Sequence, residues 1–545
     1  MSVEMCDRRK GGTILAPQQL AFMFIYHLLV KIEPVLAVFS LFYFHCVNLF
    51  FGFIHLFTNR VSVPKPQDEL LQISATQAAD MIRKREVSSS ELVEVFIRRI
   101  DQINHIINAV VIPNFDDARA QAARVDDRLD QLDDAQREKP LLGVPFTLKD
   151  CIEVAGLPCS NGMYCRRETI AEKDAAVVAR LKSAGGIVLA VTNVPEVCMW
   201  WESVNTIYGR SHNPYDNRRI TGGSSGGEAA LVASAATAVG VGSDIGGSIR
   251  MPSFFNGVFG LKPTPGVVPL QGHLPGAIPG YRAQMLRIGP ICRFAEDLST
   301  MLKVMGGPAA VELRLDDPVQ MRKMKIYYME GLHTPLAENI HDDMLHTLKR
   351  AVKYFVRKYD LTAIRVDLPL AHLALQFFLV SMYIEGEPSF RQHLDELKGS
   401  VNCFWELLKY PFGQSHHTLP ALITAIIDNP NGPFSETLVK ELRYKRDQLV
   451  REMRELLQGD GILLFPSFPH TAPYHHQPLL KPLNFAYTAL FNALAVPVVQ
   501  CPMGLAKNGM PLGVQVVGAP NSDRLLIACA KDLEEGFGGW VPPSS

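Results

Sequence analysis

Apolar residues dominate the start of this chain more strongly than any later part. Residues 35–57 read VLAVFSLFYFHCVNLFFGFIHLF and include no Asp, Glu, Lys or Arg. A helix of this length would span the roughly 30 Å hydrocarbon core of a bilayer. We therefore expect residues 1–60 to be an N-terminal membrane anchor with a single span at 35–57. The shorter apolar run at 20–30 could be an interfacial helix or the first half of a hairpin.

Two other interpretations of this apolar segment stay open. Arg8, Arg9 and Lys10 precede apolar residues as in a cleaved signal peptide, although no small-residue cleavage pattern follows the long run. A buried core helix would have the same composition. Basic residues lie on both sides of the run, so the positive-inside rule does not decide its orientation.

The rest of the chain alternates between helical and strand periods of hydrophobicity. A linker with two prolines at 61–68 separates it from the apolar segment. Capping-box sequences that begin at Ser74 and Ser88 predict two helix starts. The later pattern predicts helices over 118–132, 174–184 and 341–359, and strands over 141–148, 187–191, 461–466 and 512–517. We therefore expect residues 69–545 to form one α/β domain, a large twisted mixed β-sheet surrounded by helices.

Composition and charge argue against several classes of protein. The 545 residues are 47% hydrophobic, and the formal net charge is −1 with no long run of one sign. We expect no nucleic-acid partner, because nucleic-acid-binding proteins normally carry a basic patch. The ten cysteines have neither C-x-x-C nor zinc-finger spacing, so we expect no metal, no cofactor and no disulfide scaffold. This cysteine usage fits a reduced, cytosol-facing environment.

The stretch 222–252 carries the most chemical information. It reads GGSSGGEAALVASAATAVGVGSDIGGSIRMP and holds Ser224 and Ser248 in glycine-rich settings. Glycine allows positive φ and a close approach of backbone to ligand. We therefore expect each serine on a tight loop, with a short helix over 228–238 after the first. Four backbone N–H groups could form an oxyanion hole beside the second serine: those of Ile245, Gly246, Gly247 and Ser248.

Other motifs explain this stretch less completely. It contains neither a Walker loop nor a complete dinucleotide-binding fingerprint. The sequence GGSSG at 222–226 does match the nucleophile elbow G-x-S-x-G. That interpretation makes Ser224 the nucleophile and His470 a candidate base, but it leaves the Ser248 loop without a role. A flexible Gly/Ser linker is a further alternative, although the stretch continues into an apolar Ala/Val run.

From 222 to 252 the sequence resembles the amidase signature family, most clearly in its last part, GSDIGGSIRMP. The family's upstream string, GVPFTLKD, occurs at 143–150 and places Lys149 at the end of a predicted strand. The resemblance implies a catalytic triad in which Ser248 is the nucleophile and Ser224 relays protons to Lys149. It also implies a cis peptide bond before Ser224, and no cofactor.

The resemblance assigns roles to further residues near the triad. In the family, the segment before the Gly/Ser loop lines the substrate site. Substrate contacts are therefore expected at Cys198, Met199, Trp201 and Ser224. Ordinary core packing is the alternative for the apolar members of this group. Supporting roles, in which a residue orients a loop, are implied for Ser225, Asp244 and Arg250.

Further strings extend the resemblance to the fatty-acid amide hydrolases within this family. They are NPYD at 213–216, NFAYT at 484–488 and GGW at 538–540, together with the apolar N-terminus. The resemblance implies a membrane-bound hydrolase that cleaves long-chain fatty-acid amides to a fatty acid and an amine or ammonia through an acyl-enzyme. We expect a lipid amide substrate and an intracellular membrane or lipid-droplet surface, with the catalytic domain facing the cytosol. A homodimer stays open.

Two other functions remain as alternatives. The glutaminase-type component of an amidotransferase, its A subunit, shares the signature. The apolar N-terminus and the lack of a basic face count against that function. The other alternative is a catalytically inactive membrane scaffold, although Lys149, Ser224 and Ser248 are all present. The apolar residues at 404–412 and 419–427 predict either core helices or a cap that dips into a membrane.

Overall fold

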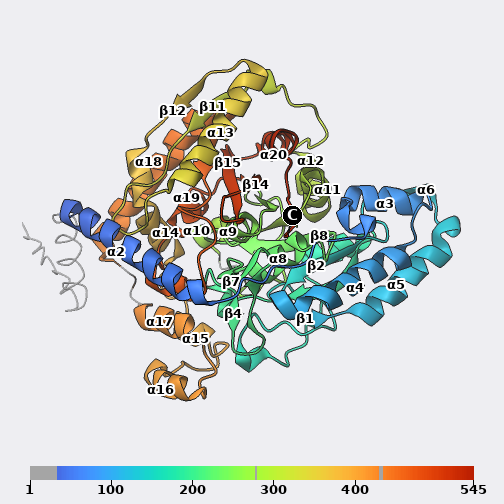
Figure 1. The fold of residues 1–545 in the computed structure, drawn as a ribbon, viewed down its shortest axis with the longest axis horizontal. Coiled ribbons are helices and arrows are strands. Elements are labelled where there is room, and N and C mark those ends of the chain that lie inside the picture. The colour runs from blue at the N-terminus through green and yellow to red at the C-terminus, as the bar shows by residue number, and fades with distance from the viewer. Residues whose placement is uncertain (1–32, 277–278, 429–431, 433, 545) are drawn as a thin grey trace, which may run out of the picture.

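The computed structural model describes residues 33–545 except 277–278, 429–431, 433 and 545. The apolar run at 20–30 lies outside the described residues. Within them, one large sheet runs through the molecule and helices surround it (Figure 1). These helices are α3 (Ala75–Arg83), α4 (Ser89–Ile107), α5 (Phe115–Arg128), α6 (Asp134–Arg137), α7 (Ala176–Ser183), α8 (Gly226–Ala233), α9 (Arg250–Phe255), α10 (Tyr281–Met285), α11 (Ala295–Gly306), α12 (Pro308–Val311), α13 (Asp342–Tyr359), α14 (Ala374–Met382), α15 (Phe390–His393), α16 (Cys403–Lys409), α17 (Leu419–Ile427), α18 (Glu436–Leu457), α19 (Ala486–Ala493) and α20 (Asp523–Phe537).

The sheet has 11 strands and is mixed, as the sequence predicts. From edge to edge they are β1 (Val110–Pro113), β3 (Ile187–Thr192), β2 (Pro145–Lys149), β8 (Val239–Asp244), β10 (Arg287–Cys292), β9 (Phe259–Lys262), β14 (Val498–Leu505), β15 (Pro511–Gly518), β13 (Gly461–Pro466), β11 (Lys325–Tyr328) and β12 (Ala363–Arg365). β2 lies parallel to both β3 and β8, whereas β10 lies antiparallel to β8 and β9. Two short hairpins lie outside the sheet: β4 (Val204–Asn205) with β5 (Gly209–Arg210), and β6 (His212–Asn213) with β7 (Asp216–Ile220).

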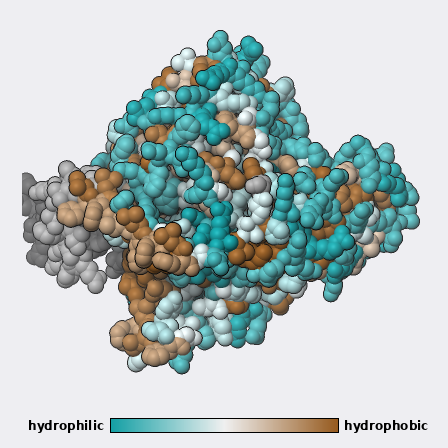
Figure 2. Space-filling view, viewed as in Figure 1, coloured by the Kyte–Doolittle hydropathy of each residue, from teal (hydrophilic) through white to brown (hydrophobic). Residues whose placement is uncertain are grey.

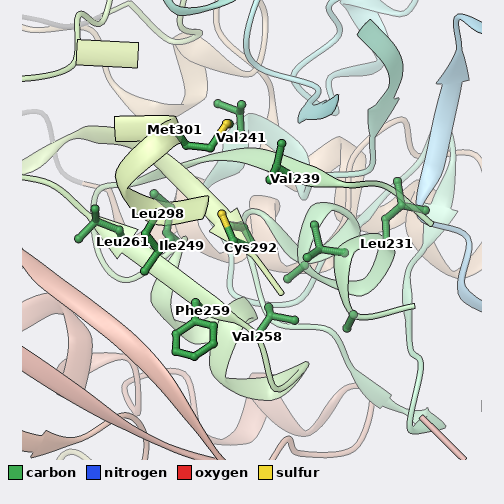
Figure 3. Packing of buried hydrophobic residues seen from close by; sticks show 14 of the residues in the cluster. Leu231, Val239, Val241, Ile249, Val258, Phe259, Leu261, Cys292, Leu298 and Met301 are labelled. Carbon is green, nitrogen blue, oxygen red and sulfur yellow. The ribbon is translucent and has the colours of Figure 1, made fainter. Parts of the chain in front are cut away.

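The central strands are buried on both faces, so they are mainly apolar or small instead of alternating, and their polar residues gather towards the carboxyl ends. Figure 3 shows part of this core, where Val241 of β8 lies beside Met301 of α11. Burying an aliphatic side chain of this size contributes about 1.5–3 kcal/mol. The core therefore fixes β8, and with it the chain that leaves its carboxyl end.

Most predicted elements are present, with differences at their ends. β13 has the predicted bounds, but β2 begins only at Pro145, because the preceding residues form a turn. The helix expected over 228–238 ends earlier, since α8 stops at Ala233. There the chain reverses to enter β8: Ala235 adopts φ +54°, and the N–H of Ala236 donates to the carbonyl of Leu231.

The apolar N-terminal segment forms α2 (Glu33–Ile54), followed by a 3-10 turn at His55–Phe57. By length and composition alone, residues 38–57 could cross a membrane. In the structure the helix lies along the body of the α/β domain (Figure 1), and Phe44, Val47 and Phe51 are buried against it. The opposite face is exposed, so the alternative of a buried core helix is wrong.

A polar contact in the middle of α2 joins it to the body. The Nδ2 of Asn48 donates to Glu338 Oε1 at 2.7 Å, and its Oδ1 accepts from Gln477 Nε2 at 2.8 Å and from the ammonium of Lys481. Burial opposes the charge of Glu338, but His470 and other basic neighbours outweigh it and hold the pKa of its carboxyl well below the ordinary value. Asn48 thus docks on a cluster of charged and polar side chains around the buried Glu338 and Lys481, which we call the α2 latch: Glu338, His341, His470, Gln477 and Lys481.

We expect Asn48→Leu to loosen α2 without unfolding the sheet. The substitution removes three hydrogen bonds and leaves buried polar groups without a partner, which costs about 1–3 kcal/mol. Amide hydrogen exchange over residues 38–54 should accelerate correspondingly, while exchange in β8 stays unchanged. His45→Leu, at an exposed position of the same helix, is the matched control. It should change amide exchange neither in residues 38–54 nor in β8. Unchanged protection of α2 in Asn48→Leu would show that the latch does not hold the helix.

Candidate active site

Lys149 and Ser224 meet at the carboxyl edge of the sheet. Lys149 is the last residue of β2, and its Nζ lies 2.7 Å from Ser224 Oγ and 3.0 Å from Ser243 Oγ. Ser243 comes from the neighbouring parallel strand β8. Among the residues that the structure describes, no carboxylate lies within ion-pair distance of Lys149. The amine is therefore surrounded by hydroxyl groups instead of counter-ions.

The loop that carries Ser224 is shaped by close backbone contacts. The peptide bond between Gly223 and Ser224 is cis, which confirms the expectation drawn from the family resemblance. A Cβ on Gly223 would lie 2.5 Å from the carbonyl oxygen of Trp200, so only glycine fits there. Ser225 ties this loop to the second one: its N–H donates to the carbonyl of Ser248 at 3.2 Å, and its Oγ accepts from the N–H of Ser243 at 3.3 Å.

A buried ion pair shapes the loop that carries Ser248. Asp244 and Arg250 are both fully buried, and the guanidinium donates to both carboxylate oxygens at 3.0 Å. The same carboxylate accepts the N–H groups of Gly247 at 2.8 Å and Ile249 at 3.2 Å. Burial opposes the charge of Asp244, but Arg250 outweighs it and holds the pKa well below the ordinary value. These contacts give Asp244 and Arg250 the geometry of supporting residues.

One of the four N–H groups expected in the oxyanion hole, that of Gly247, already has a hydrogen-bond partner within the protein. The N–H of Gly247 donates to Asp244, so it does not point freely towards a substrate. Gly247 has φ +123°, and a Cβ there would lie 2.0 Å from Thr488 Oγ1. The Thr488 hydroxyl in turn donates to the carbonyl of Gly246 at 2.8 Å. The expectation for Gly247 is thus corrected, and Ile245, Gly246 and Ser248 remain the candidate donors.

Exposure increases from the lysine to the second serine. Lys149 is 0% exposed, Ser224 2% and Ser248 8%. The Ser248 hydroxyl has no hydrogen-bond partner within the described part of the chain, so Ser224 and Ser248 are joined through the backbone of Ser225 and not directly. The hydroxyl nearest to solvent is therefore also the one that is free to meet a substrate.

Aromatic side chains from a distant part of the sequence line the Ser248 loop. A Cβ on Gly246 would meet Phe378 of α14 at 3.2 Å and Phe485 at 3.7 Å. The two rings form an edge-to-face pair, and Ile245 and Met382 pack in the same apolar cluster. Sequence analysis missed these residues, because nothing near Phe378 or Phe485 in the chain marks them as neighbours of the serine loops.

The three apolar residues expected to contact substrate lie in different settings. Cys198 has φ +54° and is buried near the triad, and Met199 packs against the cluster formed by α15 and α17. Trp201 is buried in the core behind Gly223, and its indole N–H donates to the carbonyl of Pro482 at 3.1 Å. Core packing therefore describes Trp201 better than a substrate wall does.

His470 does not serve the alternative nucleophile-elbow triad. Its Nε2 faces Glu338 at 3.2 Å in the α2 latch, and its Nδ1 donates to the carbonyl of Thr471 at 2.6 Å. Both ring nitrogens are therefore engaged away from Ser224. The titratable side chain that contacts Ser224 is that of Lys149.

Known proteins resemble this chain over nearly all of its length. The amidase family model matches residues 91–527. The chain is 44% identical to fatty-acid amide hydrolase 2 of Homo sapiens, over 88% of this chain and 92% of that protein. It is 28% identical to the A subunit of glutamyl-tRNA(Gln) amidotransferase from Koribacter versatilis, over 86% of this chain and 98% of that protein. A solved fatty acid amide hydrolase shares the fold with a TM-score of 0.69 at 21% identity, covering 86% of each chain.

Gly247→Ala tests how tightly the Ser248 loop is packed. We expect the added methyl group to displace Thr488 and lower the free energy of unfolding by about 1–3 kcal/mol through overpacking. Gly266→Ala is the matched control, because Gly266 also has positive φ but has nothing within 4 Å of its Cβ position. Chemical denaturation of both variants measures the difference. Equal losses of stability would mean that backbone strain alone, and not the contact with Thr488, requires a glycine at 247.

Proposed function

The chain belongs to the amidase family, and on that basis we propose that it hydrolyses long-chain fatty-acid amides with Lys149, Ser224 and Ser248 as its catalytic triad. The observation that carries the proposal is the 2.7 Å contact between Lys149 Nζ and Ser224 Oγ, beside a more exposed Ser248. A lysine, a relay hydroxyl and a nucleophilic hydroxyl are thus in order from the inside of the protein outwards.

In the proposed mechanism the neutral amine of Lys149 accepts the proton of Ser224. The Ser248 hydroxyl, which has no partner in the described structure, turns to Ser224 when substrate binds and gives its proton to it. The Oγ of Ser248 attacks the amide carbonyl carbon and forms a tetrahedral intermediate. N–H groups of Ile245, Gly246 and Ser248 stabilise its oxyanion; losing one such donor costs about 3–4 kcal/mol in a serine protease. The relay returns a proton to the nitrogen as the C–N bond breaks, and water then hydrolyses the acyl-enzyme.

The apolar surroundings support a substrate with a long hydrocarbon chain. Phe378 and Phe485 pack against the Ser248 loop. On another side, Met199 joins the cluster of α15 and α17, and α16 next to α17 exposes Phe404 and Trp405. Apolar residues therefore extend from the neighbourhood of the triad to the surface. A polar substrate such as glutamine would gain little from such surroundings.

The same surface supports membrane association. In Figure 2 hydrophobic colour follows α2 and continues over α17 and α16 below it. Large exposed apolar patches of this kind mark interaction sites. Because the α2 latch holds the helix along the body, we propose that α2 lies in the plane of the membrane interface in this conformation, with the exposed face of α16 and α17 beside it. Single-pass anchoring, the expectation from composition, requires α2 to leave the latch.

Two alternatives from the sequence remain testable. The amidotransferase function draws on the 28% identical relative, but the apolar surface around α16 and α17 gives such a protein no evident benefit. The inactive scaffold is disfavoured by the direct contact between Lys149 and Ser224.

Lys149→Ala should lower kcat for oleamide by about 10²–10⁴-fold, the usual contribution of a general base. Hydrolysis of methyl oleate should fall less, because an alcohol leaves more readily than an amine. Ser248→Ala should abolish labelling by a fluorophosphonate probe, and Ser225→Ala is a matched control that keeps the nucleophile. Near-normal oleamide turnover in Lys149→Ala would refute the triad. Preference for glutamine over oleamide would favour the amidotransferase alternative, and an unlabelled wild type would favour the scaffold.

The membrane proposal is tested by Trp405→Ser combined with Phe412→Ser, at side chains that are 58% and 77% exposed. Each substitution removes an apolar group worth about 1.5–3 kcal/mol on burial, so binding to phosphatidylcholine vesicles should weaken at least about tenfold. Flotation of the full chain with the vesicles measures this. Val311→Ser, at another exposed apolar position, should leave binding unchanged. If the wild type, the double variant and Val311→Ser bind the vesicles equally, α16 is not part of the membrane-binding surface.

A further inference from the structure

A buried histidine contacts Ser243, the second hydroxyl partner of Lys149. His273 belongs to the loop between β9 and α10 and is 4% exposed. Its Nε2 lies 2.8 Å from Ser243 Oγ, and Ser243 Oγ lies 3.0 Å from Lys149 Nζ. The Sγ of Cys151 lies 3.4 Å from the same Nε2. An unbroken set of hydrogen bonds thus runs from the histidine through one hydroxyl to the lysine.

The partners of the ring fix which nitrogen carries hydrogen. Nδ1 lies 3.1 Å from the carbonyl oxygen of Pro275, and a carbonyl can only accept, so Nδ1 is assigned the hydrogen. Burial is the main cause that lowers the pKa of His273 to about 4, so the ring is neutral near pH 7. Nε2 of the neutral ring is therefore an acceptor.

This tautomer sets the direction of the next hydrogen bonds. Ser243 has one hydrogen, and it donates that hydrogen to Nε2, because the Cys151 thiol at 3.4 Å is the weaker donor. The Oγ of Ser243 then presents only lone pairs to Lys149. One N–H of Lys149 accordingly donates to Ser243, which leaves the lone pair of the neutral amine for Ser224 at 2.7 Å.

We propose that His273 is a positioning residue that acts through Ser243 to keep the lone pair of Lys149 directed at Ser224. Without the acceptor at Nε2, the Ser243 hydroxyl can rotate and donate into the lysine lone pair, which would compete with Ser224 for the base. This inference rests on the proposed function, because it assigns a purpose to the neutral amine of Lys149. His273 itself touches neither Ser224 nor Ser248 in the described structure and exchanges no proton with substrate.

The test compares two amide substitutions at His273. His273→Asn places its amide near Nδ1, where it can still donate to Pro275, but it cannot reach Ser243. His273→Gln places its amide oxygen near Nε2, where it can accept from Ser243. We expect His273→Asn to lower kcat for oleamide by about 10–100-fold with KM changed less than about threefold. His273→Gln should stay within about threefold of the wild type, which a merely space-filling role would not predict.

A second set of variants keeps the inference testable if His273→Asn does not fold. Ser243→Ala, which leaves His273 unchanged, should reproduce the loss of kcat, because Lys149 then loses the oxygen that accepts its N–H and fixes its orientation. Where His273→Asn folds, adding it to Ser243→Ala should cause no further loss, because both act through one contact. Additive losses, equal losses in the Asn and Gln variants, or a loss confined to KM would overturn the proposal. So would full activity in both His273→Asn and Ser243→Ala.

The rate at which a fluorophosphonate probe labels Ser248 separates this inference from the proposed function. That rate depends on activation of Ser248 and needs no natural substrate. If the wild type does not cleave oleamide, the proposed substrate class fails, while the order of labelling rates (wild type and His273→Gln above His273→Asn) still tests the role of His273. If the labelling rates are equal while oleamide is cleaved by all variants, the further inference fails alone.

Discussion

The register between the parallel strands β2 and β8 determines the candidate site. Thr147 pairs with Gly240 and Leu148 with Val241, so Lys149 and Ser243 leave the sheet at the same edge. Successive side chains of a strand point to opposite faces, and a slip of one residue would turn Lys149 to the other face of the sheet. The small residues of β8 allow this alignment, because the side chain of Glu228 would collide with any Cβ at Gly240. The position of Lys149 thus depends on the packing of the other, chemically inert residues of β2 and β8.

The sequence alone predicts the parts of this arrangement that are local in the chain. The strand before Lys149, the glycine loop at Ser224 and the bend before Ser248 each have a short, readable pattern, and the structure places Lys149 against Ser224. Helix ends were less accurate, as α8 shows, because a chain reversal at Ala235 has no strong sequence signal. The contributions of Ser243 and His273 could not be predicted, since they depend on a contact between separate segments, which neither segment reveals.

The N-terminal helix is a second case in which contacts between distant segments could not be predicted from the sequence. Composition correctly indicates an apolar helix, but Asn48 looks like a defect in it until its partners are known. Glu338 and Lys481 come from remote parts of the chain and meet only in the folded body. A buried carboxylate and ammonium are costly to bring together unless further groups complete their hydrogen bonds. The amide of Asn48 supplies both a donor and an acceptor to this pair. These hydrogen bonds explain why a polar residue occurs within an apolar helix.

The charges around the candidate site are arranged so that they leave Lys149 without an ionised partner among the described residues. The nearest carboxyl groups have other bonds: Asp150 accepts the N–H of Ser160 at 2.8 Å, and Glu228 is bonded to two threonine hydroxyls. Burial raises the pKa of Glu228 to about 8, so this carboxyl is mostly uncharged at neutral pH. An ionised carboxylate close to a lysine favours the ammonium form, which cannot accept a proton. Asp244 and Arg250 neutralise each other and fix the Ser248 loop. A rigid loop and an amine bonded only to hydroxyls can therefore coexist within one buried site.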